Sequence, residues 1–417
     1  MAAEQLFIAI IAMLVGARVL GEVFQRLKQP AIVGELLAGI IIGPSILGLV
    51  SFSKDYSFLS DISVFFLMFL AGLEMDPREL RKAGKQAIIV SVFAFVTPLL
   101  AGYYTGTLFG LASTQAWFMG LLLSITAVPV SAIILMQLGV LNTRLGNTVM
   151  AAAVINDIMS LVALSIIIQA AHSTAVGGGH ISYIDLWLSI VKITLFVSAI
   201  ILFYLIFGMK TSAGNALLQK VSPLFRVLHT REAGFSLLLI AAIGISLAAS
   251  NMGLHFIIGT FFAGLVANKQ IIGKENFSKF HGIVSAITFG FFGPIFFGLI
   301  GVEINLQAIS GLLPLFGALL AVAIVAKIGG AYLGVRIARF SGQAGLALAF
   351  LMNGRGAVEL AIAAIGYAAG IIDTSLFSIA VAIGFVTTLI TPLTARPLVA
   401  AAKAKHLQAL EVPSEQS

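Results

Sequence analysis

Long apolar segments recur along the whole chain, separated by short stretches that contain charged residues, glycine or proline. Most have close to the ~20 residues that a helix needs to cross a bilayer. The pattern therefore predicts an all-α integral membrane protein with about 13 transmembrane helices. The predicted spans are 5–25, 31–50, 59–75, 86–109, 115–138, 145–171, 183–208, 232–250, 254–269, 280–302, 311–338, 343–370 and 374–400.

The composition agrees with this prediction. Of the 417 residues, 59% are hydrophobic and only 10% are charged, and the mean hydropathy is +1.08, whereas a soluble domain carries about 25% charged residues. The chain has no cysteine, which excludes disulfides and thiolate metal sites. The first span continues into Arg26 and Lys28 without a small-residue cleavage site, so we interpret it as a retained span and not as a signal peptide.

The positive charges are distributed unevenly over the predicted loops. When alternate loops are placed on alternate sides, one side collects nearly all of the loop lysines and arginines and the other collects only Lys54. The positive-inside rule then predicts a multi-pass protein of the cell membrane, with its N-terminus outside and its C-terminus in the cytoplasm. This asymmetry explains the net charge of +7 better than nucleic-acid binding does, so we expect no nucleic-acid partner.

Two short motifs occur twice, once in each half of the chain. VGELLAG at 33–39 is echoed by IGTFFAG at 258–264, and FLAGLEMD at 69–76 by GLIGVEIN at 298–305. If six spans repeat around a linking seventh, the second copy enters the membrane from the opposite face. Such an inverted repeat is typical of secondary transporters with a site near the midplane. We therefore expect one membrane domain, 1–417, comprising a first repeat 1–171, a linking helix and cytoplasmic connector 172–231, a second repeat 232–402 and a short cytoplasmic tail 403–417.

Asp157 is the main candidate for a functional site. It interrupts the apolar stretch MAAAVINDIMSLVALSIII at 150–168 together with Asn156, and an ionisable residue inside a span costs roughly 3 kcal/mol on insertion scales. A poorly solvated carboxylate is expected to be neutralised near physiological pH, by one proton or by one hard monovalent cation. Asn156 does not titrate, which leaves one titrating acid. The alternative is an acid paired permanently with Lys327 to hold two helices together.

Two spans carry helix breakers at depth. In SITAVPVS at 124–131, Pro129 removes one backbone hydrogen bond, and the freed carbonyls near Thr126 are suitable ligands for a desolvated cation. In LMNGRGAVEL at 351–360, Gly354 and Gly356 surround Arg355 at the equivalent position of the second half. Paired interruptions in corresponding helices indicate a transporter site, whereas single breakers commonly produce only kinks.

Three further ionisable residues lie deep in the predicted spans. Arg355 and Glu359 are spaced i, i+4 and are able to pair along their own helix. A buried Lys327 needs a counter-charge, which Glu359 or Asp157 must supply. We favour a structural brace between Lys327 and Glu359, which leaves Asp157 free to exchange its ligand. The rival arrangement binds Lys327 to Asp157 until a cation displaces it.

These residues together resemble the monovalent cation:proton antiporter-2 family almost end to end. The resemblance implies a thirteen-helix fold, a homodimer with a dimerisation domain, and a mobile core domain with two crossing broken helices that moves like an elevator. Asp157 matches the family's ion-binding aspartate and Lys327 its intramembrane lysine. Asn156 stands where the electrogenic branch has Asp, which implies electroneutral exchange. The motifs are GELLAGIIIGPSILG (34–48), FLAGLEMD (69–76), TAVP (126–129), VINDIMSL (154–161), HFIIGTFFAGL (255–265) and MNGRGAVEL (352–360).

The sequence therefore predicts an antiporter that exchanges Na+ or K+ for H+ one to one on Asp157. Ala127 stands where the neighbouring sodium/proton exchanger family has an acid, so only the backbone, Thr126 and Glu74 remain to supplement Asp157. We expect no cofactor, no metal beyond the transported cation, and no enzyme activity, since the sequence has no P-loop, Gly-x-Ser-x-Gly elbow or HExxH motif. A cation channel or uniporter of the potassium-efflux type is the alternative. An intramembrane aspartyl protease needs two facing aspartates, and we find one deep aspartate.

Overall fold

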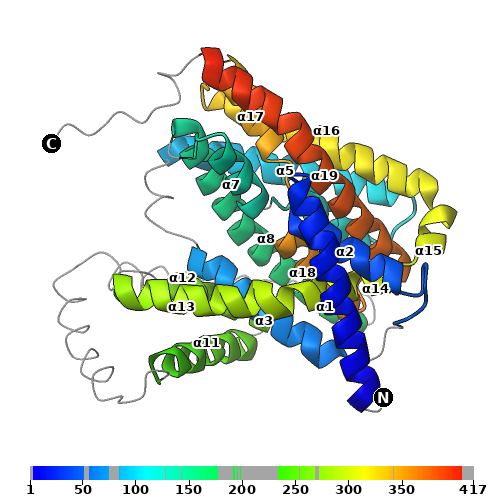
Figure 1. The fold of residues 1–417 in the computed structure, drawn as a ribbon. Coiled ribbons are helices and arrows are strands. Elements are labelled where there is room, and N and C mark those ends of the chain that lie inside the picture. Colours follow the sequence, from blue (N-terminus) through cyan, green and yellow to red (C-terminus); the bar gives the residue numbers. More distant parts are fainter. Residues whose placement is uncertain are drawn as a thin grey trace. The chain divides into compact units, whose positions relative to one another are not determined.

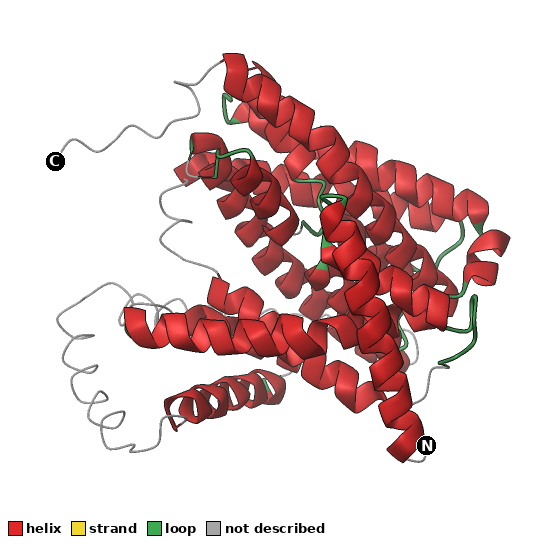
Figure 2. Cartoon of the chain, in the orientation of Figure 1, coloured by secondary structure: helices red, strands yellow, loops and turns green. Residues whose placement is uncertain are grey.

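The computed structural model describes most of the chain, and every regular element in the described part is a helix (Figure 2). The described residues are 3–50, 56–74, 84–126, 128–141, 143–176, 191, 192, 195, 198, 233–252, 254–267, 272–340 and 342–405. The predicted linking span and cytoplasmic connector lie outside these residues, apart from the four isolated positions, as does the tail beyond 405.

Figure 1 shows the helices in chain order. Seven helical stretches of the described part are long and apolar enough to cross a membrane, and four shorter apolar helices accompany them. The protein is therefore a multi-pass membrane protein. The helices are α1 Ala3–Arg26, α2 Ala31–Ile42, α3 Ser57–Glu74, α5 Gly84–Leu108, α6 Ser113–Ser124, α7 Val128–Gln137, α8 Arg144–Val176, α11 Ala233–Asn251, α12 Phe256–Val266, α13 Lys274–Ile287, the π-helical turn η2 Thr288–Phe292, α14 Gly293–Glu303, α15 Leu306–Gly311, α16 Leu313–Ile337, α17 Gly342–Leu351, α18 Ala357–Ala368 and α19 Thr374–Lys405.

Several predicted spans differ in detail from the helices observed. The predicted span 31–50 is too long, because α2 ends at Ile42, where Gly43 closes its last turn on the carbonyl of Gly39 and Pro44 follows. The predicted span 280–302 is composite, since the π-helical turn η2 separates α13 from α14. The spans predicted at 115–138 and 343–370 are each divided into two short helices.

The chain forms two compact units. The first comprises Met1–Tyr56, Arg78–Ile168 and Phe297–Ser417, and the second comprises Ser57–Pro77 and Gln169–Phe296. The first unit contains both divided helix pairs, α6–α7 and α17–α18, together with α5, α16 and α19. The candidate site residues therefore fall in the first unit, with the exception of Glu74, which ends α3 in the second.

Small residues let the helices of the first unit approach closely. A methyl group added to Gly330 of α16 would lie 2.7 Å from Cβ of Thr97 in α5, and one added to Gly102 of α5 would lie 2.7 Å from Cα of Gly120 in α6. Such backbone proximity is how membrane helices gain van der Waals contact without help from the hydrophobic effect. Helices α16, α5 and α6 thus form a closely packed series that supports the site.

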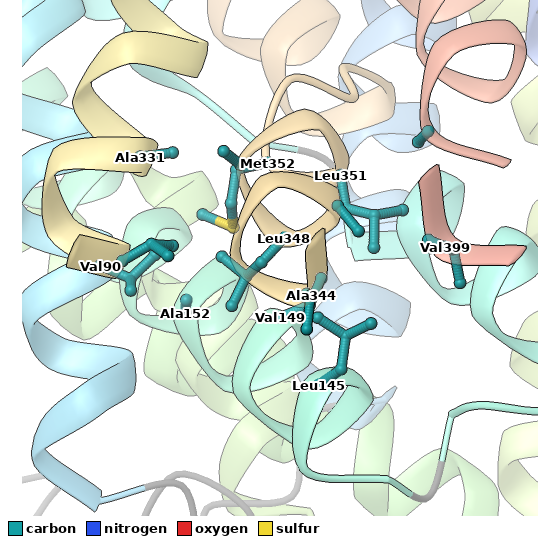
Figure 3. Packing of buried hydrophobic residues seen from close by; sticks show 14 of the residues in the cluster. Val90, Leu145, Val149, Ala152, Ala331, Ala344, Leu348, Leu351, Met352 and Val399 are labelled. Carbon is teal, nitrogen blue, oxygen red and sulfur yellow. The ribbon is translucent and has the colours of Figure 1, made fainter. Parts of the chain in front are cut away.

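An apolar cluster surrounds α17 in the same unit (Figure 3). Leu348, Leu351 and Met352 at the end of this helix are fully buried. They are enclosed by side chains of α5, α8, α16 and α19, so the second helix interruption is anchored on all of these elements. The labelled neighbours are Val90, Leu145, Val149, Ala152, Ala331 and Val399.

The first copy of each echoed motif contacts the second copy of the other motif. In the first unit, a methyl group added to Gly39 of α2 would lie 2.9 Å from Cα of Gly301 in α14. In the second unit, a methyl group added to Gly264 of α12 would lie 2.9 Å from Cα of Gly72 in α3. Gly39 and Gly264 are equivalent in the motif pairs, as are Gly72 and Gly301. In each unit, therefore, a motif of the GELLAG type contacts a motif of the FLAGLE type from the other half of the chain, and the contact uses equivalent glycines.

Candidate functional site

Two helix interruptions lie side by side in the first unit. The chain leaves the helical conformation at Ile125 and Thr126, and α7 begins at Val128. The second interruption runs from Met352 to Gly356, between α17 and α18. Thr126 Oγ1 donates to the carbonyl of Met352 at 3.1 Å, so the first break is hydrogen bonded to the second.

A second hydrogen bond joins the same elements. Ser131 Oγ of α7 donates to the carbonyl of Leu351 at 2.7 Å. The last four carbonyls of any helix lack intrahelical donors, and Leu351 ends α17. The hydroxyl groups of the first break region therefore satisfy carbonyls that the second break exposes. Pro129 lies in the first turn of α7, and Gly354 and Gly356 lie within the second interruption.

Two cationic side chains cap the end of α6. Arg355 donates from Nη1 to the carbonyl of Leu122 at 2.6 Å and from Nη2 to the carbonyl of Leu123 at 2.8 Å. Lys327 Nζ of α16 donates to the carbonyl of Ser124. The C-terminus of a helix carries a partial negative charge, which positive groups stabilise. Both cations are thus placed by the break in the first half of the chain.

Glu359 of α18 pairs with Arg355, which lies in the interruption just before this helix. Arg355 Nη1 lies 2.7 Å from Glu359 Oε1, and both side chains are buried, with exposures of 0% and 1%. No ion pair within 4.0 Å joins Lys327 to Glu359, both of which the structure describes, so the favoured brace is not a direct contact and stays a prediction. Lys327 binds a carbonyl and interacts with Glu359 only at longer range. The general reason is that a backbone carbonyl at a helix end accepts from an ammonium group as a carboxylate does.

Asp157 is buried in α8, with an exposure of 2%. Its Oδ1 has no hydrogen-bond partner among the described residues. Lys327 is close enough to interact with it electrostatically, and Lys327 also contacts the end of α6. The acid is therefore linked through one lysine to the pair of helix interruptions.

Several other polar atoms near the breaks lack partners within the described part of the chain. They are Asn156 Oδ1 and Nδ2, Asn353 Oδ1 and Glu359 Oε2. Buried polar groups in folded proteins are almost always hydrogen bonded, so these atoms are available to bind water or a cation. Most of the unpaired atoms are oxygens, which are the ligands that hard cations prefer. The residues present therefore fit a hard cation.

Sequence reasoning missed two threonines of α19 at the second interruption, Thr388 and Thr391. Thr388 of α19 donates from Oγ1 to the carbonyl of Arg355 at 3.0 Å. Asn353 Nδ2 lies 3.4 Å from Thr391 Oγ1, also on α19. The available signal was the spacing of these threonines, which places hydroxyl groups on one side of an otherwise apolar helix.

Glu74 belongs to a different local environment. It ends α3 in the second unit, where His281 Nε2 lies 3.8 Å from its Oε1. Its side chain is 39% exposed, unlike the fully buried Asp157. The structure therefore groups Glu74 with His281, while Thr126, Asn156, Asp157, Lys327, Arg355 and Glu359 lie in the first unit.

Comparison with known proteins agrees with this architecture. The chain is 33% identical over 357 residues to the probable Na+/H+ antiporter GerT of Bacillus cereus, covering 85% of this chain and 89% of the relative. It is 31% identical over 388 residues to the Na+/H+-K+ antiporter GerN of the same organism, covering 93% and 95%.

A solved structure shows the same fold. The sodium proton antiporter MjNhaP1 of Methanocaldococcus jannaschii at pH 8 superposes with a TM-score of 0.72 at 18% identity, covering 97% of this chain and 100% of that one. Residues 9–401 match the family described as sodium/hydrogen exchanger, transmembrane. This chain belongs to the sodium/hydrogen exchanger family.

Proposed function

We propose that the protein is a secondary active antiporter that exchanges Na+ or K+ for H+, with Asp157 holding the proton and the cation in turn. The observation that carries this proposal is the buried Asp157 carboxyl with an unpaired oxygen. One proton and one monovalent cation each neutralise the same charge, so they compete for the group. The relatives GerT and GerN, which are named as antiporters, support the same assignment.

The proposed stoichiometry is one to one. Asn156 beside Asp157 does not titrate, and Glu359 is engaged by Arg355, which leaves Asp157 as the single carrier. Exchange would then move no net charge and would ignore the membrane potential. A second proton per cycle would add about 2.3 kcal/mol per 100 mV. GerN, whose name includes both Na+ and K+, is a reason to test both cations.

The proposed transport cycle is an elevator-like movement of the helices that carry the breaks. Two echoed motifs with reciprocal glycine contacts support an inverted repeat of 1–171 and 232–402. We further propose a homodimer, with the N-terminus outside and the C-terminus in the cytoplasm. The loop charges support this orientation. The protein acts in this scheme as a transporter and not as an enzyme.

The experiment is dequenching of a pH-sensitive dye in proteoliposomes, titrated separately with Na+, K+ and Li+. The parent protein should release protons only when a transported cation is supplied on the opposite side. Asp157→Asn should abolish the signal, whereas Asp61→Asn on the exposed face of α3 should leave it intact. Proton flux without a counter-cation would favour the channel alternative, and parental exchange by Asp157→Asn would refute the assignment of Asp157.

A further inference from the structure

A polar cavity of about 340 Å³ lies in the first unit, away from the helix breaks. It is bordered by the end of α2, the segment from α14 to α15, and the loop between α18 and α19. Its polar lining consists of Ser45, Glu303, Asn305, Gln307, Tyr367 and Thr374. Such a volume accommodates several water molecules together with an ion.

This cavity is distinct from the site at Asp157. Helix α18 begins beside the second interruption at Ala357 and ends at Ala368, next to the cavity. Twelve helical residues span about 18 Å at 1.5 Å per residue. The cavity therefore lies about one bilayer half-thickness from the break, toward one membrane face.

Glu303 supplies the only formal charge among the described residues that line the cavity. Its side chain is half-buried, and it forms no ion pair or hydrogen bond with the rest of the described chain. No lysine, arginine or histidine is among the lining residues. The cavity thus carries one acidic group and no basic group among its described lining residues.

The neutral groups around Glu303 are mostly oxygens held in place by hydrogen bonds. Tyr367 and Thr374 share a hydrogen bond at 3.2 Å between their hydroxyl groups, and Ser45 Oγ donates to the carbonyl of Ile304. The backbone N–H of Asn305 donates to Ser378 Oγ at 2.9 Å. Hydrogen bonds therefore hold several of the lining residues in place, and their oxygens match a hard cation.

We propose that this cavity is a second cation-binding site, which takes one partly hydrated monovalent cation at the membrane face where α2 and α14 end. A single carboxylate with neutral oxygens balances one positive charge, whereas a divalent ion would keep an excess charge. The volume exceeds that of a dehydrated ion, so part of the hydration shell is retained. The site raises the local concentration of the transported cation on that face. This proposal rests on the proposed antiport.

The hairpin of α1 and α2 indicates on which membrane face the cavity lies. These helices pack along each other (Figure 1) and are joined by residues 27–30, so α2 runs back toward the face on which the N-terminus lies. In the proposed orientation this is the external face. A cation there would occupy the cavity before or after it visits Asp157.

The first test locates the ion directly, with Tl+ as an electron-dense monovalent probe. Crystals of the full chain soaked in a thallous salt should show an anomalous peak at the Glu303 carboxylate, and the peak should persist in Asp157→Ala. Glu303→Gln should remove this peak and keep any peak at Asp157. Density at Asp157 alone, or no density in the cavity of the parent, would overturn the proposal.

The second test measures transport from each face in oriented proteoliposomes. Glu303→Gln should raise the KM for a cation supplied at the cavity face by about tenfold. This is the lower end of the gain in local cation concentration that a charged cleft produces. The variant's maximal rate and its KM from the opposite face should stay at the parental values. Glu4→Gln, an exposed carboxylate at the N-terminal end of α1, is the matched control and should change neither constant.

Tyr367→Phe provides an independent variant, because it removes one hydroxyl and keeps the ring stacked on Phe377 at 4.9 Å. It should raise the same one-sided KM by a smaller factor. An equal rise on both faces would indicate a structural effect and would contradict the proposal. Loss of exchange in Asp157→Asn tests the antiport itself, so the two proposals fail through different measurements.

Discussion

Lys327 of α16 donates a hydrogen bond to the carbonyl of Ser124, the last residue of α6. The sequence separation between the two residues is 203 positions. Arg355 donates to the two carbonyls that precede Ser124. The end of a helix in the first half is therefore held by two cations from the second half, each of which donates to backbone carbonyls.

Replacing Lys327 tests whether its role is to cap α6. Lys327→Gln keeps a donor for Ser124 and should retain near-normal exchange with lower thermal stability. Lys327→Met leaves the carbonyl without a donor, which costs about 1–3 kcal/mol for a buried acceptor, so it should melt at a lower temperature than Lys327→Gln. Thermal denaturation and vesicle exchange, measured on the same preparations, check both statements. Abolished coupling in Lys327→Gln at parental stability would instead favour the pairing of Lys327 with Asp157.

The ion pair of Arg355 and Glu359 should be structural. Removing one partner of a buried pair costs about 3–5 kcal/mol, because an uncompensated charge remains. We expect Arg355→Gln to be more destabilising than Glu359→Gln, since Arg355 also serves the carbonyls of Leu122 and Leu123. A double-mutant cycle on the free energy of unfolding should give a non-zero coupling energy between the two residues. Additive effects of the two substitutions would contradict this prediction.

Asn156→Asp should change the charge moved per cycle. A second buried carboxyl beside Asp157 gives the site a second proton to release, which makes exchange dependent on the membrane potential by about 2.3 kcal/mol per 100 mV. Imposing a potassium diffusion potential on Na+-loaded vesicles measures this dependence. Asn156→Ser adds no acid and is the control. A parental response to voltage in Asn156→Asp would show that the added acid does not take part.

Gly301→Ala should destabilise the contact between α14 and α2. The new methyl group would lie 2.8 Å from Cα of Gly39, and overpacking of this kind typically costs about 1–3 kcal/mol. Gly317→Ala in α16 is the matched control, because nothing lies within 4 Å of its added methyl. The control should be neutral or gain up to about 1 kcal/mol from helix propensity. Equal melting temperatures for the two variants would contradict the close contact.

Most of the fold could be predicted from the sequence, because hydrocarbon forces long apolar segments to be helical. The helix breaks at 125–126 and 352–356 also followed from Pro129 and from the glycines around Arg355. The π-helical turn at Thr288–Phe292 was not predictable, since TFGFF contains no distinctive breaker. The reciprocal glycine contacts were equally hidden, as a motif repeat shows equivalence and does not show which copies touch.

The partners of the buried charges were only partly predictable. The pairing of Arg355 with Glu359 followed from their i, i+4 spacing, although Arg355 lies in the interruption just before α18. The partner of Lys327 did not, because reasoning from residue types matches charge with charge and overlooks carbonyls at a helix end. The cavity beside Glu303 was likewise invisible, since its walls come from segments more than 250 positions apart.

The long-range caps on α6 also bear on how the chain is made. A ribosome adding about 5–20 residues per second needs roughly 10–40 s to proceed from Ser124 to Lys327. During that interval the carbonyls of residues 122–124 have no donor from Lys327 or Arg355. Nascent α6 must therefore keep this end in contact with water, or within the insertion machinery, until the later half of the polypeptide has emerged.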